Sequence, residues 1–98
     1  MILYKDNIFT GVKVRLDNSR YESCIFKNCI IEYGGEGEVA LVGNEFLNCQ
    51  WVFVGCAQNT LNFMQTMYHS MGPFGKEMIE GTFNNIKNGI VHKAENNN

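Results

Sequence analysis

The sequence has no cluster of basic residues. Its 98 residues include 8 Lys and Arg against 10 Asp and Glu, which gives a net charge of −2 at pH 7. A protein that binds the phosphate backbone of nucleic acid needs grouped Lys and Arg, so this balance argues against DNA as a partner. The chain is also too weakly acidic to imitate the charge of DNA.

Long apolar runs are missing as well. No stretch reaches the roughly 20 residues that a membrane-spanning helix needs. The chain does not open with the basic, apolar and small-residue series of a signal peptide. We therefore expect a cytoplasmic protein without a membrane partner.

Metal-ligand spacing is another absence. The chain has two His, far apart, and four Cys without the paired spacing of a zinc site. In a reducing compartment these Cys are expected to remain free thiols rather than a disulfide framework. We predict no metal site and no cofactor.

What the sequence does contain is a repeat. The segment Phe26–Tyr33 returns twenty positions later as Phe46–Phe53, and a looser copy, Phe9–Leu16, precedes both. Extended backwards, the repeat gives three units of about fifteen residues. They span 2–16, 19–33 and 39–53. Self-similarity of this kind is typical of a solenoid.

Each unit ends in alternating apolar and polar residues. A period of two predicts a strand with one buried face. Gly11, Asn28 and Asn48 precede these strands in equivalent positions, and Gly or Asn tolerates a bend. In register, the units stack Phe9, Phe26 and Phe46 in one column. The predicted fold is mainly β with a C-terminal α cap, namely a three-coil parallel β-helix. The alternative is a small antiparallel sandwich with accidental self-similarity.

A helical hairpin is predicted after Phe53. Asn59 is a good N-cap, and apolar residues at spacings of three and four predict helices over about 60–71 and 76–88, separated by Gly72-Pro73. We expect one domain over 1–93 and a disordered polar tail over 94–98. Because the first coil has no cap, we also expect a homo-oligomer.

The chain resembles a group of short bacterial and phage proteins of unassigned function. The resemblance rests on Phe46–Phe53, which reads F-x-N-C-x-W-x-F, followed by Gly55-Cys56-Ala57, Asn59–Phe63 and Glu80–Phe83. The coils also resemble those of pentapeptide-repeat proteins, which are short right-handed β-helices, without their strict five-residue period. The resemblance implies a β-helix and supplies no established activity.

The segment Gly72–Lys76 is the first candidate site. Backbone N–H groups at a helix start, flanked by Gly72 and Gly75 and followed by Lys76, can hold a phosphate or carboxylate. Tyr68 and His69 lie just before it, and Gln65 shares a helical face with His69. Such residues suit a nucleotide, with an aromatic ring for the base and donors for the phosphate. The alternative is an ordinary turn between helices with a solvated Lys.

Cys56 is the second candidate. A thiol near a helix start can become a nucleophile, with His69 or His92 as its base. No third residue at a telling spacing orients them, so a buried junction cysteine is the simpler interpretation and we predict no enzyme.

The leading hypothesis is a small non-catalytic binding protein, associated with phages, that sequesters an anionic small molecule such as a nucleotide signal. The alternative is a protein-interaction or oligomeric structural module without a small ligand, which would use the Met- and aromatic-rich helices.

Overall fold

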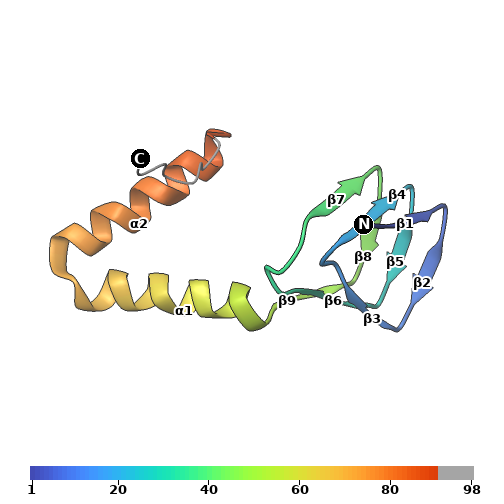
Figure 1. Cartoon of the computed structure of the whole chain (residues 1–98), viewed down its shortest axis with the longest axis horizontal. Helices are drawn as coiled ribbons and strands as arrows, with labels where there is room; N and C mark the ends of the chain where they lie inside the picture. Colours follow the sequence, from blue (N-terminus) through green and yellow to red (C-terminus); the bar gives the residue numbers. More distant parts are fainter. Residues whose placement is uncertain (91–98) are drawn as a thin grey trace. The chain divides into compact units, whose positions relative to one another are not determined.

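The structure, a computed structural model, describes residues 1–90 and consists of nine short strands followed by two helices (Figure 1). The strands are β1 (Ile2–Lys5), β2 (Ile8–Thr10), β3 (Lys13–Arg15), β4 (Ser19–Glu22), β5 (Ile25–Lys27), β6 (Ile30–Tyr33), β7 (Val39–Val42), β8 (Glu45–Leu47) and β9 (Gln50–Phe53). The helices are α1 (Gly55–Ser70) and α2 (Gly72–Lys87).

The strands form a three-coil parallel β-helix, as the repeat predicts. Each coil contributes one strand to each of three parallel sheets, ordered β1-β4-β7, β2-β5-β8 and β3-β6-β9. The register is the predicted one, with Phe9 beside Phe26 and Phe26 beside Phe46. The parallel pairing excludes the antiparallel sandwich.

The corners of the coils depend on residues that accept a positive φ. Gly11, Asn28 and Asn48 have φ of 64°, 53° and 53°, which confirms the predicted bend. The Nδ2 of Asn48 also donates a hydrogen bond to the Oδ1 of Asn28, at 2.8 Å. A second corner, not predicted, lies at Asp6, Ser23 and Gly43, with φ of 55°, 54° and 65°. Because of this corner each coil has three strands.

The core lies mainly within the middle coil, and Val14 and Leu16 of the first coil also belong to it. Phe26 and Ile31 have exposed fractions of 0%, and Cys29 has 1%. The Phe26 ring stacks on Phe9 at a centroid distance of 5.0 Å and on Phe46 at 4.8 Å. Tyr4 and Tyr21 form a second stack, at 4.8 Å. These columns follow directly from the strand spacing of about 4.8 Å.

The two outer coils are covered on one side only within this unit. Val12 in the first coil is 45% exposed, although its equivalent in the middle coil, Cys29, is buried. In the third coil Trp51 is 48% exposed. Its ring lies 4.9 Å from that of Phe46 with a tilt of 54°. The regular aromatic column therefore ends at Trp51.

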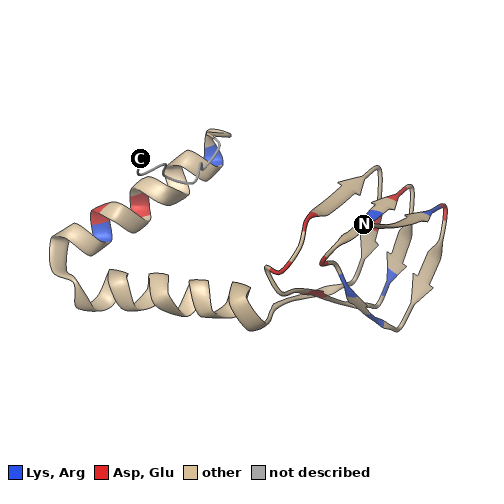
Figure 2. Ribbon diagram, viewed as in Figure 1, with Lys and Arg blue, Asp and Glu red and all other residues tan. Residues whose placement is uncertain are grey.

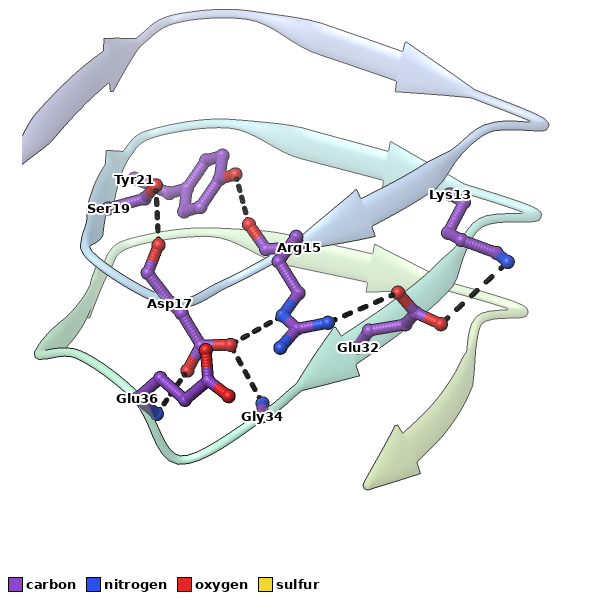
Figure 3. Close-up of polar contacts among 8 residues, drawn as sticks. All are labelled: Lys13, Arg15, Asp17, Ser19, Tyr21, Glu32, Gly34 and Glu36. Carbon is purple, nitrogen blue, oxygen red and sulfur yellow. Dashed lines mark hydrogen bonds and ion pairs between the residues drawn. The ribbon is translucent and has the colours of Figure 1, made fainter. Parts of the chain in front are cut away.

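Asp17 lies in the turn after β3 and forms hydrogen bonds with the connector between the second and third coils (Figure 3). Its carboxylate accepts hydrogen bonds from the Arg15 Nε and from the backbone N–H groups of Gly34, at 2.8 Å, and Glu36, at 3.2 Å. A side chain on Gly34 would collide with Arg15 and Asp17. Arg15 also lies beside Glu32, its partner in the pairing of β3 with β6, with Nη1 and Oε1 3.9 Å apart.

The hydrogen bonds to the Asp17 carboxylate predict that acid lowers the stability of the β-helix. Burial raises the pKa of Asp17, but the hydrogen bonds from Arg15, Glu36 and Gly34 outweigh it and hold the pKa below its ordinary value. The stability that this carboxylate contributes is therefore complete above the unfolded-state pKa and is lost as pH falls through the lower folded-state pKa.

We expect Asp17→Asn to lower the free energy of unfolding at pH 7 by about 1 kcal/mol, because the amide cannot accept all these hydrogen bonds. Urea denaturation at pH 7 and below pH 3 measures this, with Glu36→Gln as the control because only the backbone of Glu36 bonds Asp17. The difference between wild type and Asp17→Asn should shrink in acid. If the difference in the free energy of unfolding is the same at both pH values, the stabilising role of the Asp17 carboxylate is contradicted.

The helices differ from the predicted boundaries. α1 begins at Gly55, so Asn59 lies inside the helix rather than capping it. The N–H of Ala57 donates to the carbonyl oxygen of Gly34, at 3.1 Å, which anchors the first turn of α1 on the connector. α2 begins at Gly72, and Met71 alone separates the helices.

The chain divides into two compact units. The first covers Met1–Thr60 and the second begins at Leu61. The predicted tail over 94–98, and the domain boundary at 93, lie outside the described residues. Within residues 1–90, neither helix combines the length and apolarity that crossing a bilayer requires.

Candidate functional site

The second unit contains a groove between α1 and α2. It has a volume of about 430 Å³, which is within the range of small-molecule sites. The residues that line it are Leu61, Met64, Gln65, Tyr68 and His69 of α1 and Ile79, Glu80 and Phe83 of α2. A mainly apolar surface with a few polar groups is the usual chemistry of a ligand pocket.

Helical spacing explains why these residues meet. Leu61, Met64 and Tyr68 recur at three and four on α1, and Ile79 and Phe83 recur at four on α2. Tyr68 is half-buried and Ile79 is buried, at 8% exposure. The apolar stripes of the two helices thus line the groove together with the exposed polar residues Gln65, His69 and Glu80.

Tyr68, His69 and Lys76 form the most distinctive cluster. The Nζ of Lys76 lies over the Tyr68 ring, 5.8 Å from its centroid, in a cation–π arrangement. The His69 ring meets the Tyr68 ring edge to face, with centroids 5.3 Å apart. A cation and two ring systems therefore lie together beside the groove, as the sequence predicts from the proximity of 68, 69 and 76.

Gly72–Lys76 form the start of α2 rather than a loop before it, and anion binding by these residues stays a prediction. Pro73 has no N–H, so it removes one donor from the helix start. Gly75 is buried, and a Cβ at this position would overlap the backbone oxygen of Met67. Its lack of a side chain allows α1 and α2 to approach closely. Gly72 and Gly75 are not among the residues that line the groove.

The charge of the hairpin is low and confined to α2. No Lys, Arg, Asp or Glu occurs in α1, whereas α2 carries Lys76, Glu77, Glu80 and Lys87 (Figure 2). Lys76 favours an anion beside Tyr68. Glu80 lines the groove itself and opposes an anion there. The order of these charges along α2 therefore favours a ligand whose negative group lies at the Lys76 end.

A polar, uncharged stripe runs along α1 beside the groove. It lines a shallow second hollow of about 360 Å³, formed by Asn62, Gln65, Thr66, His69 and Ser70. Gln65 and His69 border both hollows. The shared helical face predicted for these two residues is confirmed.

Three of the six predicted site residues, Gln65, Tyr68 and His69, line the groove, and Lys76 contacts it through Tyr68. The sequence reasoning missed Glu80 and did not join the apolar stripes of the two helices into one surface. The four-residue spacing of Lys76 and Glu80 was the signal that could have placed Glu80 near the site.

Cys56 lies in the first turn of α1 and is exposed, so it is not the buried junction cysteine of the simpler interpretation. His69 follows thirteen residues further along the same helix. His92, the other proposed base, lies outside the described residues. The part of the chain that the structure describes holds no group of three His, Cys, Asp or Glu arranged for a metal ion.

Comparisons with protein-family models, curated proteins and solved structures find no match to this chain. The case for a function therefore rests on the groove and its surroundings.

Proposed function

We propose that the protein is a non-catalytic, cytoplasmic binding protein that captures an anionic small molecule of nucleotide chemistry in the groove between α1 and α2. The observation that carries the proposal is the position of the Lys76 ammonium over the Tyr68 ring at the edge of an apolar groove. The base would lie against the apolar side chains of the groove and the phosphate beside Lys76. Sequestration of a nucleotide signal during phage infection is the setting we propose for such capture.

The electrostatics of α2 support this orientation. Lys76 lies in a helix whose N-terminal end carries partial positive charge, and these two charges add for an anion at that end. Glu80 follows one turn later. A phosphate at the Lys76 end gains the attraction of Lys76, and its distance from the carboxylate of Glu80 limits the repulsion.

A nucleotide panel tests the proposal. Nucleoside mono-, di- and triphosphates and cyclic nucleotides are screened by thermal shift, and each positive is measured by isothermal titration calorimetry. We expect at least one nucleotide to raise Tm and Lys76→Ala to weaken its binding by roughly 10–100-fold, as expected for loss of a charged contact. A flat panel would contradict the proposal.

Glu80→Gln is the matched variant. It removes the opposing charge from the groove and keeps the size of the side chain. We expect it to strengthen nucleotide binding several-fold, opposite to Lys76→Ala, with both effects decreasing at high salt. Equal weakening by both variants would indicate a loss of hairpin structure, and circular dichroism of each variant checks for this.

A second candidate is a protein-interaction module without a small ligand. The observation that favours it is the exposure of large apolar side chains on the hairpin outside the groove lining, such as Phe63 and Phe74, each 63% exposed, and Met78, 49% exposed. Apolar surface of this kind marks binding sites for macromolecules as well. If this candidate is correct, no nucleotide in the panel raises Tm. Phe74→Ser, rather than Lys76→Ala, then abolishes binding of a protein partner.

A further inference from the structure

We propose that the α1–α2 hairpins of two copies of this chain pack together about a twofold axis, groove against groove, so that each copy closes the groove of the other. The pairing itself does not require a ligand. The idea that it encloses the nucleotide rests on the proposed function.

The hairpin has too little core of its own. Among residues 61–90 only Met67 and Ile79 are buried hydrophobic side chains. Each helix is 16 residues long, and isolated helices of about this length are marginal in water. Two such hairpins that bury their apolar faces in each other form a four-helix bundle, the ordinary solution for this pattern.

The apolar area of the groove face suits a dimer. Leu61, Phe83 and Ile86 are 42–54% exposed. Ile86 continues the helical stripe of Ile79 and Phe83, whereas Ile90 follows the end of α2 at Lys87. These three side chains and the exposed parts of Met64 and Tyr68 are uncovered on a single hairpin. The centre of a protein interface is mainly apolar, so this face has the composition that a second copy would cover.

The charges of this face are compatible with its own copy. An isologous interface brings each patch against itself, so a patch of one sign would repel its copy. α1 carries no Lys, Arg, Asp or Glu, and α2 carries two Lys and two Glu. Lys76 and Glu80 lie one turn apart. A twofold axis between them places Lys76 of one copy near Glu80 of the other.

The pairing would also complete the ligand site. On one hairpin the groove is open, whereas small-molecule sites usually bury about 70–90% of their ligand. A second hairpin supplies the missing wall and brings a second Tyr68, His69 and Lys76 to the same ligand. In the dimer Lys76 of the second copy also offsets Glu80 of the first.

Sedimentation equilibrium without nucleotide, from about 1 to 100 µM, tests the pairing. We expect a dimer for the wild type and an increase in Kd of roughly 100-fold for Phe83→Asp, because a carboxylate would be buried without a partner. Asn84→Asp is the matched control, since it adds the same charge at the adjacent exposed position and should leave Kd unchanged. Leu61→Asp repeats the test on α1.

Four outcomes overturn the inference. They are a monomeric wild type at 100 µM, a dimer that survives both Phe83→Asp and Leu61→Asp, equal effects of Phe83→Asp and Asn84→Asp, and a dimer abolished by Ile8→Asp at the open edge of the first coil. Calorimetry with nucleotide separates the two proposals. Undiminished nucleotide binding by monomers of Ile86→Asp, a substitution outside the groove lining, would overturn the enclosed site and leave the proposed function standing. A dimer that binds no nucleotide would overturn the proposed function alone.

Discussion

Phe26→Ala is expected to lower the free energy of unfolding by about 3–5 kcal/mol, the usual cost of truncating a buried Phe. Phe26 is 0% exposed and contacts three other rings, those of Phe9, Tyr21 and Phe46. The loss is large against the roughly 5–15 kcal/mol that stabilises an ordinary domain. Urea denaturation followed by near-ultraviolet circular dichroism measures it.

Phe9→Ala is the matched control, because Phe9 occupies the end of the same column and is half-buried. Its removal leaves a site that is open to water on one side rather than a closed cavity, so the loss should be clearly smaller. If both substitutions lower the free energy of unfolding equally, the middle coil does not contribute more to stability than the first coil.

Gly75→Ala is expected to disrupt the hairpin. A Cβ at Gly75 would overlap the backbone oxygen of Met67, which is rigid helical backbone and cannot rotate away as a side chain could. The helices must separate, at a cost of about 1–3 kcal/mol as in other overpacked sites. The groove between α1 and α2 should be distorted as well. We expect faster amide hydrogen exchange over 61–87 and loss of nucleotide binding.

Gly81→Ala makes the same chemical change six residues later and should act in the opposite direction. Nothing lies within 4 Å of a Cβ at Gly81, and the residue is in the middle of α2. The higher helix propensity of Ala should stabilise the helix by about 1 kcal/mol. If Gly75→Ala were as well tolerated as Gly81→Ala, the close approach of the helices would be contradicted.

The β-helix could be predicted from the sequence because the repeat occurs three times, which fixes the register of the strands. Phe9, Phe26 and Phe46 occupy equivalent places, and each copy confirms the alignment of the others. Gly11 and Asn28 marked one corner for the same reason. The corner at Asp6, Ser23 and Gly43 was missed because three different residue types occupy it, although each has a positive φ.

The hairpin was predicted less well, since it has no second copy in the sequence. Its apolar spacing located both helices, but their starts were placed four or five residues too late. Gly72-Pro73 was interpreted as a loop, whereas Pro is well tolerated in the first turn of a helix, where its missing N–H needs no partner. The sequence predicts Gly75 as part of an anion site, which stays a prediction. The constraint that the structure adds at Gly75, the nearby Met67 backbone, comes from tertiary packing that local sequence does not reveal.

The candidate site was accordingly found in part. Tyr68, His69 and Lys76 are close in sequence, and a prediction from sequence proximity was sufficient to join them. The second helix contributes Ile79, Glu80 and Phe83 to the groove. These residues lie beside α1 only because the chain turns at Met71. The opposing roles of Lys76 and Glu80 therefore became apparent only from the structure.

The most direct test of the account is a titration of the ¹⁵N-labelled protein with the nucleotide that gives the largest thermal shift, followed by amide chemical-shift mapping. The groove predicts saturable shifts centred on Gln65, Tyr68 and Phe83, with Lys76→Ala removing them and the coils 2–53 unaffected. Shifts confined to the coils, or the absence of saturable shifts at any residue up to millimolar nucleotide, would contradict it.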